Sequence, residues 1–231
     1  MRVAIIENTA ITHHGQLGVA LHEAGALIDL HRPFRGEPLP DLAAADALVV
    51  FGGEQSAIDD ARHPYLPELA RRMAGFHATG RPILGICLGS QILARAFGGT
   101  NLVGSHPEFG WVEVTLTEAG RADPVLSAAG DRFRSFQWHS DSFTLPEGAV
   151  HLAESAGAAH QAFRIGRATY GTQFHFEANR AVVADWTRTF PALTEGMSPG
   201  WIARHPRLAP SLGAEADRAG LALARAWVAL V

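Results

Sequence analysis

Residues 82–91 read Pro-Ile-Leu-Gly-Ile-Cys-Leu-Gly-Ser-Gln, an apolar run that gives way at Cys87 to a segment with helical spacing. Gly85 and Gly89 flank the cysteine as Gly-x-Cys-x-Gly. This pattern is typical of a nucleophile elbow, a tight strand-to-helix turn that holds a reactive side chain above a sheet. The free N–H groups and positive end of the following helix would favour the thiolate. Cys87 is therefore predicted to be a catalytic nucleophile.

An inert Cys87 is the main alternative, because a lone cysteine is more often a small buried hydrophobe. It is the only cysteine among 231 residues, which excludes an internal disulfide. The flanking glycines, the apolar strand before it and the amphipathic segment 88–97 after it supply the context that the elbow requires. This context favours the nucleophile.

Apolar runs alternate with helical patterns through the first part of the chain, which indicates a mostly parallel sheet with helices on both faces. Strands are expected at residues 2–6, 27–30, 47–51 and 82–86, and helices at 15–23, 65–77 and 88–97. In such a sheet the active residues lie on loops at the carboxyl ends of the strands. Both Gly52-Gly53 and Cys87 occupy this position.

After Gly98-Gly99 the expected strands follow one another more closely, which predicts an added antiparallel portion of the same sheet. They are expected at residues 110–116, 132–136, 149–154, 161–165 and 169–174, followed by helices at 178–190 and 214–230. Residues 194–212 are rich in proline, glycine and serine and are expected to form a surface loop with a short helix. Residues 1–231 are predicted to form one domain, with a core of about residues 1–190 and a C-terminal helical extension at 191–231.

The composition excludes several functions. Hydrophobic residues make up 47% and charged residues 18% of the chain, and no apolar stretch approaches the roughly 20 residues of a membrane span. A formal charge of −4 without a basic stripe argues against nucleic-acid binding. The chain has no lysine, which excludes Schiff-base chemistry and a Walker-type phosphate loop. One cysteine and no signal peptide favour a reducing, cytoplasmic location.

No metal or cofactor is expected. The histidines at positions 13, 14, 22 and 31 match no known spacing of metal ligands, and no second cysteine is available. These histidines are expected to lie on the surface or in the core.

A thiol nucleophile needs a base, and the base needs a group that orients it. His175 and Glu177 supply both functions, because residues two apart in an extended segment face the same side. Phe174 and Phe176 would then point away into packing. A His-x-Glu pair alone is a weak signal, but beside the elbow it completes a catalytic set. Two other interpretations, Cys87 as a redox-sensing thiol and the chain as a non-catalytic module, would leave the pairing of His175 with Glu177 unexplained.

An oxyanion hole needs backbone N–H groups directed at the negative charge that develops on the substrate oxygen. The N–H of Leu88 follows the nucleophile directly and is expected to be one donor. The second donor is expected at Gly53, in the loop that leaves the third strand, where glycine lets the backbone approach a substrate. A Gly-Gly pair is otherwise simply a turn.

Three separated motifs give the chain its resemblance to the class I, triad-type glutamine amidotransferases: residues 51–53 (Phe-Gly-Gly), 85–91 (Gly-Ile-Cys-Leu-Gly-Ser-Gln) and 171–177 (Gly-Thr-Gln-Phe-His-Phe-Glu). The resemblance covers roughly residues 1–190 and is strongest to the glutaminase domain of GMP synthase and its free-standing relatives, partly through residues 138–143. It implies a flavodoxin-like three-layer sandwich.

The resemblance also implies roles for individual residues. Cys87 would be the nucleophile, His175 the base and Glu177 its orienter, with a γ-glutamyl thioester as intermediate. Glutamine would be held by Gln91 and by the backbone around Gly53, Ser140 and Asp141. His139 and Asp141 have an alternative interpretation as a loop hydrogen-bond pair without substrate contact.

Two positions depart from the family pattern. Phe176 stands between the histidine and the glutamate, and Glu54 follows the Gly-Gly pair, where the family usually has proline at both. The first change removes no reacting group. The second places a carboxylate near a pocket that must bind a zwitterionic amino acid, which leaves the substrate open.

The sequence therefore supports two enzymatic hypotheses. The first is a glutaminase that releases ammonia to a separate synthetase chain, because this chain has no nucleotide-binding motif of its own. The second is a γ-glutamyl hydrolase or peptidase that uses the same triad on another γ-glutamyl amide, with water as acceptor and no partner. A regulatory module that has lost activity is a third alternative, against which the intact Cys87, His175 and Glu177 argue.

Overall fold

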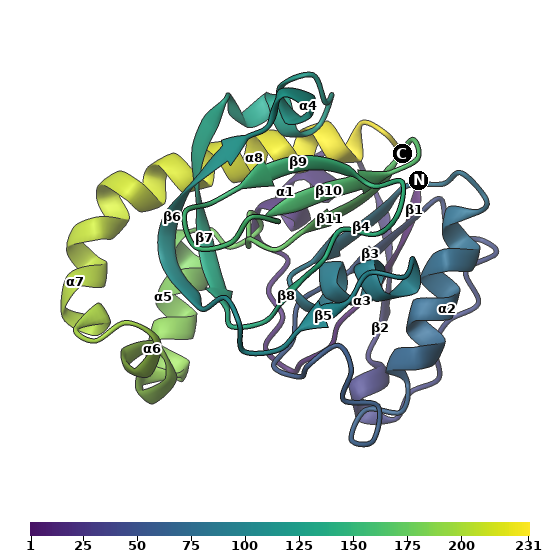
Figure 1. The fold of residues 1–231 in the computed structure, drawn as a ribbon, viewed down its shortest axis with the longest axis horizontal. Helices are drawn as coiled ribbons and strands as arrows, with labels where there is room; N and C mark the ends of the chain where they lie inside the picture. The colour runs from purple at the N-terminus through teal and green to yellow at the C-terminus, as the bar shows by residue number, and fades with distance from the viewer.

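The computed structural model describes residues 1–231 and contains a nine-stranded sheet in the order β2-β1-β3-β4-β11-β10-β9-β6-β7 (Figure 1). The first five strands of this order are parallel and the remaining four antiparallel, which confirms the predicted mixed α/β fold. The strands are β1 (Arg2–Ile6), β2 (Leu27–His31), β3 (Ala47–Val50), β4 (Ile83–Ile86), β6 (Glu108–Leu116), β7 (Arg132–His139), β9 (Val150–Glu154), β10 (Ala162–Ile165) and β11 (Thr169–Thr172). A separate two-stranded sheet pairs β5 (Asn101–Leu102) with β8 (Ser142–Phe143).

Helices cover both faces of the sheet (Figure 1). They are α1 (Gly15–Glu23), α2 (Leu66–His77), α3 (Leu88–Ala96), α4 (Glu118–Arg121), α5 (Arg180–Thr189), α6 (Pro191–Met197), α7 (Trp201–Leu208) and α8 (Ala214–Val228). None of these helices is both long enough and apolar enough to cross a membrane.

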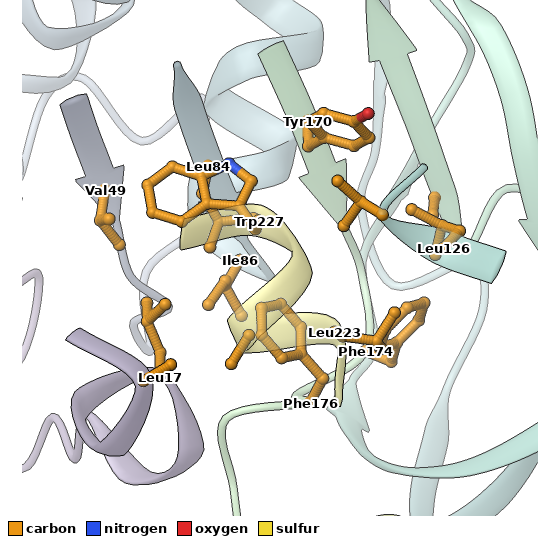
Figure 2. Close-up of a cluster of buried hydrophobic side chains, with 14 of the residues drawn as sticks. Leu17, Val49, Leu84, Ile86, Leu126, Tyr170, Phe174, Phe176, Leu223 and Trp227 are labelled. Atoms are coloured by element: carbon orange, nitrogen blue, oxygen red, sulfur yellow. The ribbon is translucent and has the colours of Figure 1, made fainter. Parts of the chain in front are cut away.

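The alternation of side chains along each strand divides the core between the two faces. Within β1, Val3 and Ile5 join a buried cluster with α1 and α8, whereas Ala4 and Ile6 join a second cluster with α2 and α3. Figure 2 shows part of the first cluster, where Trp227 of α8 lies over the sheet. Burial on both faces explains why the parallel strands are almost entirely apolar in sequence.

The expectation of a surface loop at residues 194–212 is wrong, because most of this segment is helical. Trp201 is buried in a third hydrophobic cluster, together with Trp111 of β6 and Phe136 of β7, and this burial anchors α7. The Glu195 carboxylate accepts hydrogen bonds from the backbone N–H groups of Gly200 and Ile202, at 2.7 and 2.8 Å. These tertiary and capping contacts override the turn-like composition.

Candidate active site

Cys87 lies between β4 and α3 with φ +52° and ψ −110°, and it is the only residue other than glycine with a positive φ. Such a conformation is unfavourable for a residue with a Cβ atom. The turn closes only because its neighbours are glycines: a Cβ on Gly85 would lie 2.5 Å from the Gly89 oxygen, and one on Gly89 would lie 2.0 Å from the Val50 oxygen. The predicted strand-elbow-helix geometry is present.

The strand predicted at 169–174 ends at Thr172, so His175 lies beyond β11, where it forms a bridge to Phe136 of β7. A turn follows it, in which Ala178 N–H donates to the His175 oxygen at 3.2 Å, so the chain from His175 to Glu177 is not the extended segment that the sequence predicts. The backbone N–H of His175 donates to the Phe136 oxygen at 2.8 Å. His175 Nδ1 is 2.7 Å from Glu177 Oε1, and both side chains are buried. Phe174 and Phe176 are both buried in the core cluster that includes α1 and α8, as expected from the sequence.

The charges around His175 favour its protonated form. Burial by itself lowers the pKa of the imidazole, but the negative charges of Glu177 and of the Cys87 thiolate outweigh burial and raise this pKa to about 10. An imidazolium paired with a thiolate is the state in which cysteine hydrolases attack a carbonyl.

The backbone of Gly52 lies between the nucleophile and the base. A Cβ atom on Gly52 would lie 3.1 Å from His175 Cε1 and 3.4 Å from Cys87 Cβ, so a side chain there would crowd both groups. The next residue, Gly53, lines the pocket, and neither its N–H nor that of Leu88 donates a hydrogen bond within the protein. Both N–H groups are therefore free to bind a ligand oxygen.

The glutamate is held in place by two helices from opposite ends of the chain. Gln16 N–H at the start of α1 donates to the Glu177 backbone oxygen at 2.8 Å, and a Cβ on Gly15 would lie 1.9 Å from that same oxygen. A Cβ on Gly220 of α8 would lie 2.1 Å from the backbone oxygen of Phe176. The backbone that carries Glu177 is thus closely packed on both sides.

The predicted substrate-binding residues line the same pocket as Cys87. Gln91 is buried and donates to Gln173 Oε1 at 3.1 Å, while Ser140 is exposed. Asp141 Oδ1 accepts a hydrogen bond from Gly104 N–H at 2.8 Å, which fixes the loop that follows β7. Glu54 also lines the pocket and accepts a hydrogen bond from the Thr9 hydroxyl at 3.2 Å.

Sequence reasoning missed Glu108, which supports this loop from behind the pocket. Its carboxylate lies 3.1 Å from His139 Nε2 and accepts hydrogen bonds from Ser155 and Gln161. Burial alone would raise the pKa of Glu108, but the hydrogen bonds and the charge of His139 outweigh it and hold the pKa below its usual range. The only signal in the sequence was His139 itself, because Glu108 comes to lie opposite it only through the pairing of β6 with β7.

The histidines near the N-terminus have separate partners. His13 Nε2 lies 2.8 Å from Asp185, and His14 Nε2 lies 3.0 Å from Glu7. No three histidine, cysteine, aspartate or glutamate side chains are grouped in a way that could hold a metal ion.

The pocket has a volume of about 310 Å³, at the lower end of the range of about 300–1,000 Å³ that is usual for small-molecule sites. Its lining includes polar groups, among them Gln91, Ser140 and Asp141. It also includes five apolar side chains that we call the apolar wall: Trp138 of β7, Trp186 of α5, Phe190, and Leu193 and Met197 of α6. Sequence reasoning did not assign these five side chains to the site.

Comparison with known families matches the class-I glutamine amidotransferase model to residues 20–182. The chain is 34% identical over 181 residues to the glutamine amidotransferase-like protein YfeJ of Salmonella typhimurium, a match that covers 77% of this chain and 76% of that protein. It is 30% identical over 178 residues to a glutamine-hydrolysing GMP synthase subunit from Methanoregula boonei, a match that covers 74% of this chain and 89% of that one.

Solved structures agree with this match. A glutamine amidotransferase from Thermotoga maritima has a TM-score of 0.86 at 26% identity, and the match covers 100% of this chain and 97% of that one. A glutamine amidotransferase from Methylobacillus flagellatus has a TM-score of 0.86 at 29% identity, with coverage of 100% and 95%. The chain belongs to the class-I glutamine amidotransferases, a family of amide-hydrolysing enzymes.

Proposed function

We propose that this protein hydrolyses the side-chain amide of glutamine or of a closely related γ-glutamyl amide through Cys87, His175 and Glu177. The observation that carries the proposal is the 2.7 Å contact between His175 and Glu177, beside a cysteine held on a strained elbow. This is the nucleophile, base and orienter arrangement of a triad.

The reaction would proceed in two steps. The Cys87 thiolate attacks the γ-carbonyl carbon, the carbon–sulfur bond forms, and the carbon–nitrogen bond breaks as His175 gives a proton to the departing amine. Water then adds to the γ-glutamyl thioester, with His175 as base; the carbon–sulfur bond breaks, the Cys87 thiolate is restored and glutamate leaves. The N–H groups of Gly53 and Leu88 would bind the oxyanion in both steps. Gln91, Ser140 and Asp141 would hold the amino-acid end.

Ammonia released from glutamine would pass to a separate synthetase in the first version of this function. The similarity to the Methanoregula boonei GMP synthase subunit supports it, as does the GMP synthase of Aeropyrum pernix, of which the chain spans only 28%. In this version docking of the partner would bring the oxyanion donors into their final position, and the isolated chain should be a slow glutaminase, because the loss of one such donor lowers turnover by about 10²–10³. A thiolate nucleophile would suit a reducing cytoplasm.

A second version needs no partner and acts on other γ-glutamyl amides. The pocket favours it, because Glu54 adds a carboxylate and the apolar wall extends the site beyond the reacting atoms. A high rate of the isolated chain on such an amide, with glutamine much poorer, would establish this version.

A glutamine-like diazoketone tests the shared chemistry. It should add the mass of one reagent molecule less N2, which leaves as the thiol is alkylated, to the protein at Cys87, as located by peptide mapping, and abolish ammonia release. The Cys87→Ala variant should take up no reagent. Absence of the adduct under conditions that label a known glutaminase would refute Cys87 as the nucleophile.

A further inference from the structure

The apolar wall includes Trp186, the side chain that packs against His175, the proposed general acid. His175 must return a proton to that amine, so the amine nitrogen lies within hydrogen-bond reach of the imidazole. The ring of Trp186 packs edge-on against His175, with centroids 5.3 Å apart. Any substituent on the nitrogen therefore begins beside Trp186.

The remaining wall side chains continue from this point toward solvent. Trp138 packs on Trp186 at 5.6 Å and on Phe190 at 5.9 Å between ring centroids. Leu193 and Met197 of α6 follow, and Leu193 is 57% exposed. Bare ammonia has no apolar surface to bury, so a glutaminase gains nothing from this surface.

The five side chains of the wall carry no charge themselves, although His13 packs on Trp186 with ring centroids 6.4 Å apart. The other ionisable lining residues outside the triad are Glu54, His139 and Asp141. Transfer of an apolar group from water to such a surface is favourable. A charged or strongly polar amine substituent would lose its hydration there without a partner.

We propose, resting on the thioester chemistry described above, that the preferred substrate is a γ-glutamyl amide whose amine carries an aromatic or bulky alkyl group. The polar side of the pocket holds the γ-glutamyl part and the apolar wall holds the amine substituent. Hydrolysis releases glutamate and the free amine, with water as the only other reactant.

Two synthetic amides test the proposal: γ-glutamyl-benzylamide and γ-glutamyl-ethanolamide, whose amines have similar basicity but differ in polarity. The benzylamide should have a kcat/KM at least about tenfold higher, because apolar pockets discriminate by about 10–200-fold for small apolar increments. The combined Leu193→Ala and Met197→Ala variant should reduce this ratio about tenfold. Ile202→Ala on α7, an exposed apolar residue that does not line the pocket, is the matched control and should leave the ratio unchanged.

The possible outcomes separate the two proposals. Equal kcat/KM values for the two amides would overturn the inference, as would an equal fall in kcat/KM for both amides in the double variant. Hydrolysis of glutamine in the same experiment would still support the triad. Preference for γ-glutamyl-putrescine would assign the subsite to a cationic amine and also overturn it. No hydrolysis of any amide, together with an unlabelled Cys87, would instead refute the proposed function.

Discussion

Nε2 of His139 lies 3.1 Å from the carboxylate of Glu108, and both side chains are buried. The other ring nitrogen of His139 lies 2.9 Å from the backbone oxygen of Asp141. The pair therefore connects β6 to the loop of Ser140 and Asp141. We interpret Glu108 and His139 as positioning residues that hold this side of the pocket in place.

Glu108→Gln should raise KM for a γ-glutamyl substrate about tenfold and change kcat much less, because it disturbs substrate binding and leaves the triad intact. Steady-state kinetics measure this split. An equal fall in kcat would contradict a positioning role, and Glu113→Gln, at an exposed site on the same strand, is the control.

Glu108 also predicts how stability depends on acid. Because the pKa of Glu108 is below its unfolded value of about 4.3, its ionised form stabilises the fold above that pH, and this contribution is lost as the pH falls through the folded pKa. Urea unfolding of wild-type protein between about pH 6 and pH 3 should show the loss. The Glu108→Gln variant should show a shallower one.

The three triad residues should respond unequally to substitution. Cys87→Ala and His175→Ala should both be essentially inactive, because each removes a group that forms or breaks bonds. Glu177→Gln should retain more turnover than either, since it leaves a base that is only poorly oriented. Ammonia release with glutamine in excess measures all three. A Glu177→Gln enzyme as active as wild type would remove Glu177 from the mechanism.

His175 gives the opposite pH dependence from Glu108. Its pKa of about 10 lies above the ordinary value of 6.5, so the stabilisation from protonated His175 is complete below about pH 6.5 and is lost as the pH rises toward 10. Glu177→Gln removes the main charge that raises this pKa. The alkaline loss of stability should therefore be smaller in that variant and be complete at a lower pH, as urea unfolding would show.

Gly53→Ala should lower kcat by about 10²–10³, because it displaces one proposed oxyanion donor. The added Cβ would lie 2.9 Å from both Asn8 Cβ and Leu88 Cδ2, so the loop must move. Gly75→Ala in α2 is the matched control, since nothing lies within 4 Å of its new Cβ. That control should be fully active and more stable by up to about 1 kcal/mol.

The parts of the fold that follow from local pattern were predicted well. β1 and α1 begin and end where the sequence places them, because apolar strands buried on both faces and an amphipathic helix leave clear periodic signals. The helices at residues 194–212 were missed since Trp201 and Glu195 stabilise them through contacts that composition does not reveal.

The residues of the candidate site likewise fall into those that local motifs predict and those that only tertiary contacts place. Sequence motifs predicted both the elbow at Cys87 and the His-x-Glu pair. In the structure, the bridge between His175 and Phe136 of β7 helps to hold the pair near the elbow. Glu108 and Trp186 could not be found, because their positions depend on how β6 pairs with β7 and where α5 packs. The division of the chain into one domain with an extension stays a prediction.

The close approach of α8 to Phe176 accounts for one departure from the family pattern. Phe176 lines the same small cavity as Leu223 and Trp227, both on α8 (Figure 2). A proline at position 176 would leave that space poorly filled, while a phenylalanine without the helix would lie in water. Phe176 and α8 should therefore occur together: relatives with a large apolar residue between the histidine and the glutamate should also have a C-terminal helix. A protein truncated to residues 20–182 would lose α8 and with it a part of its catalytic scaffold.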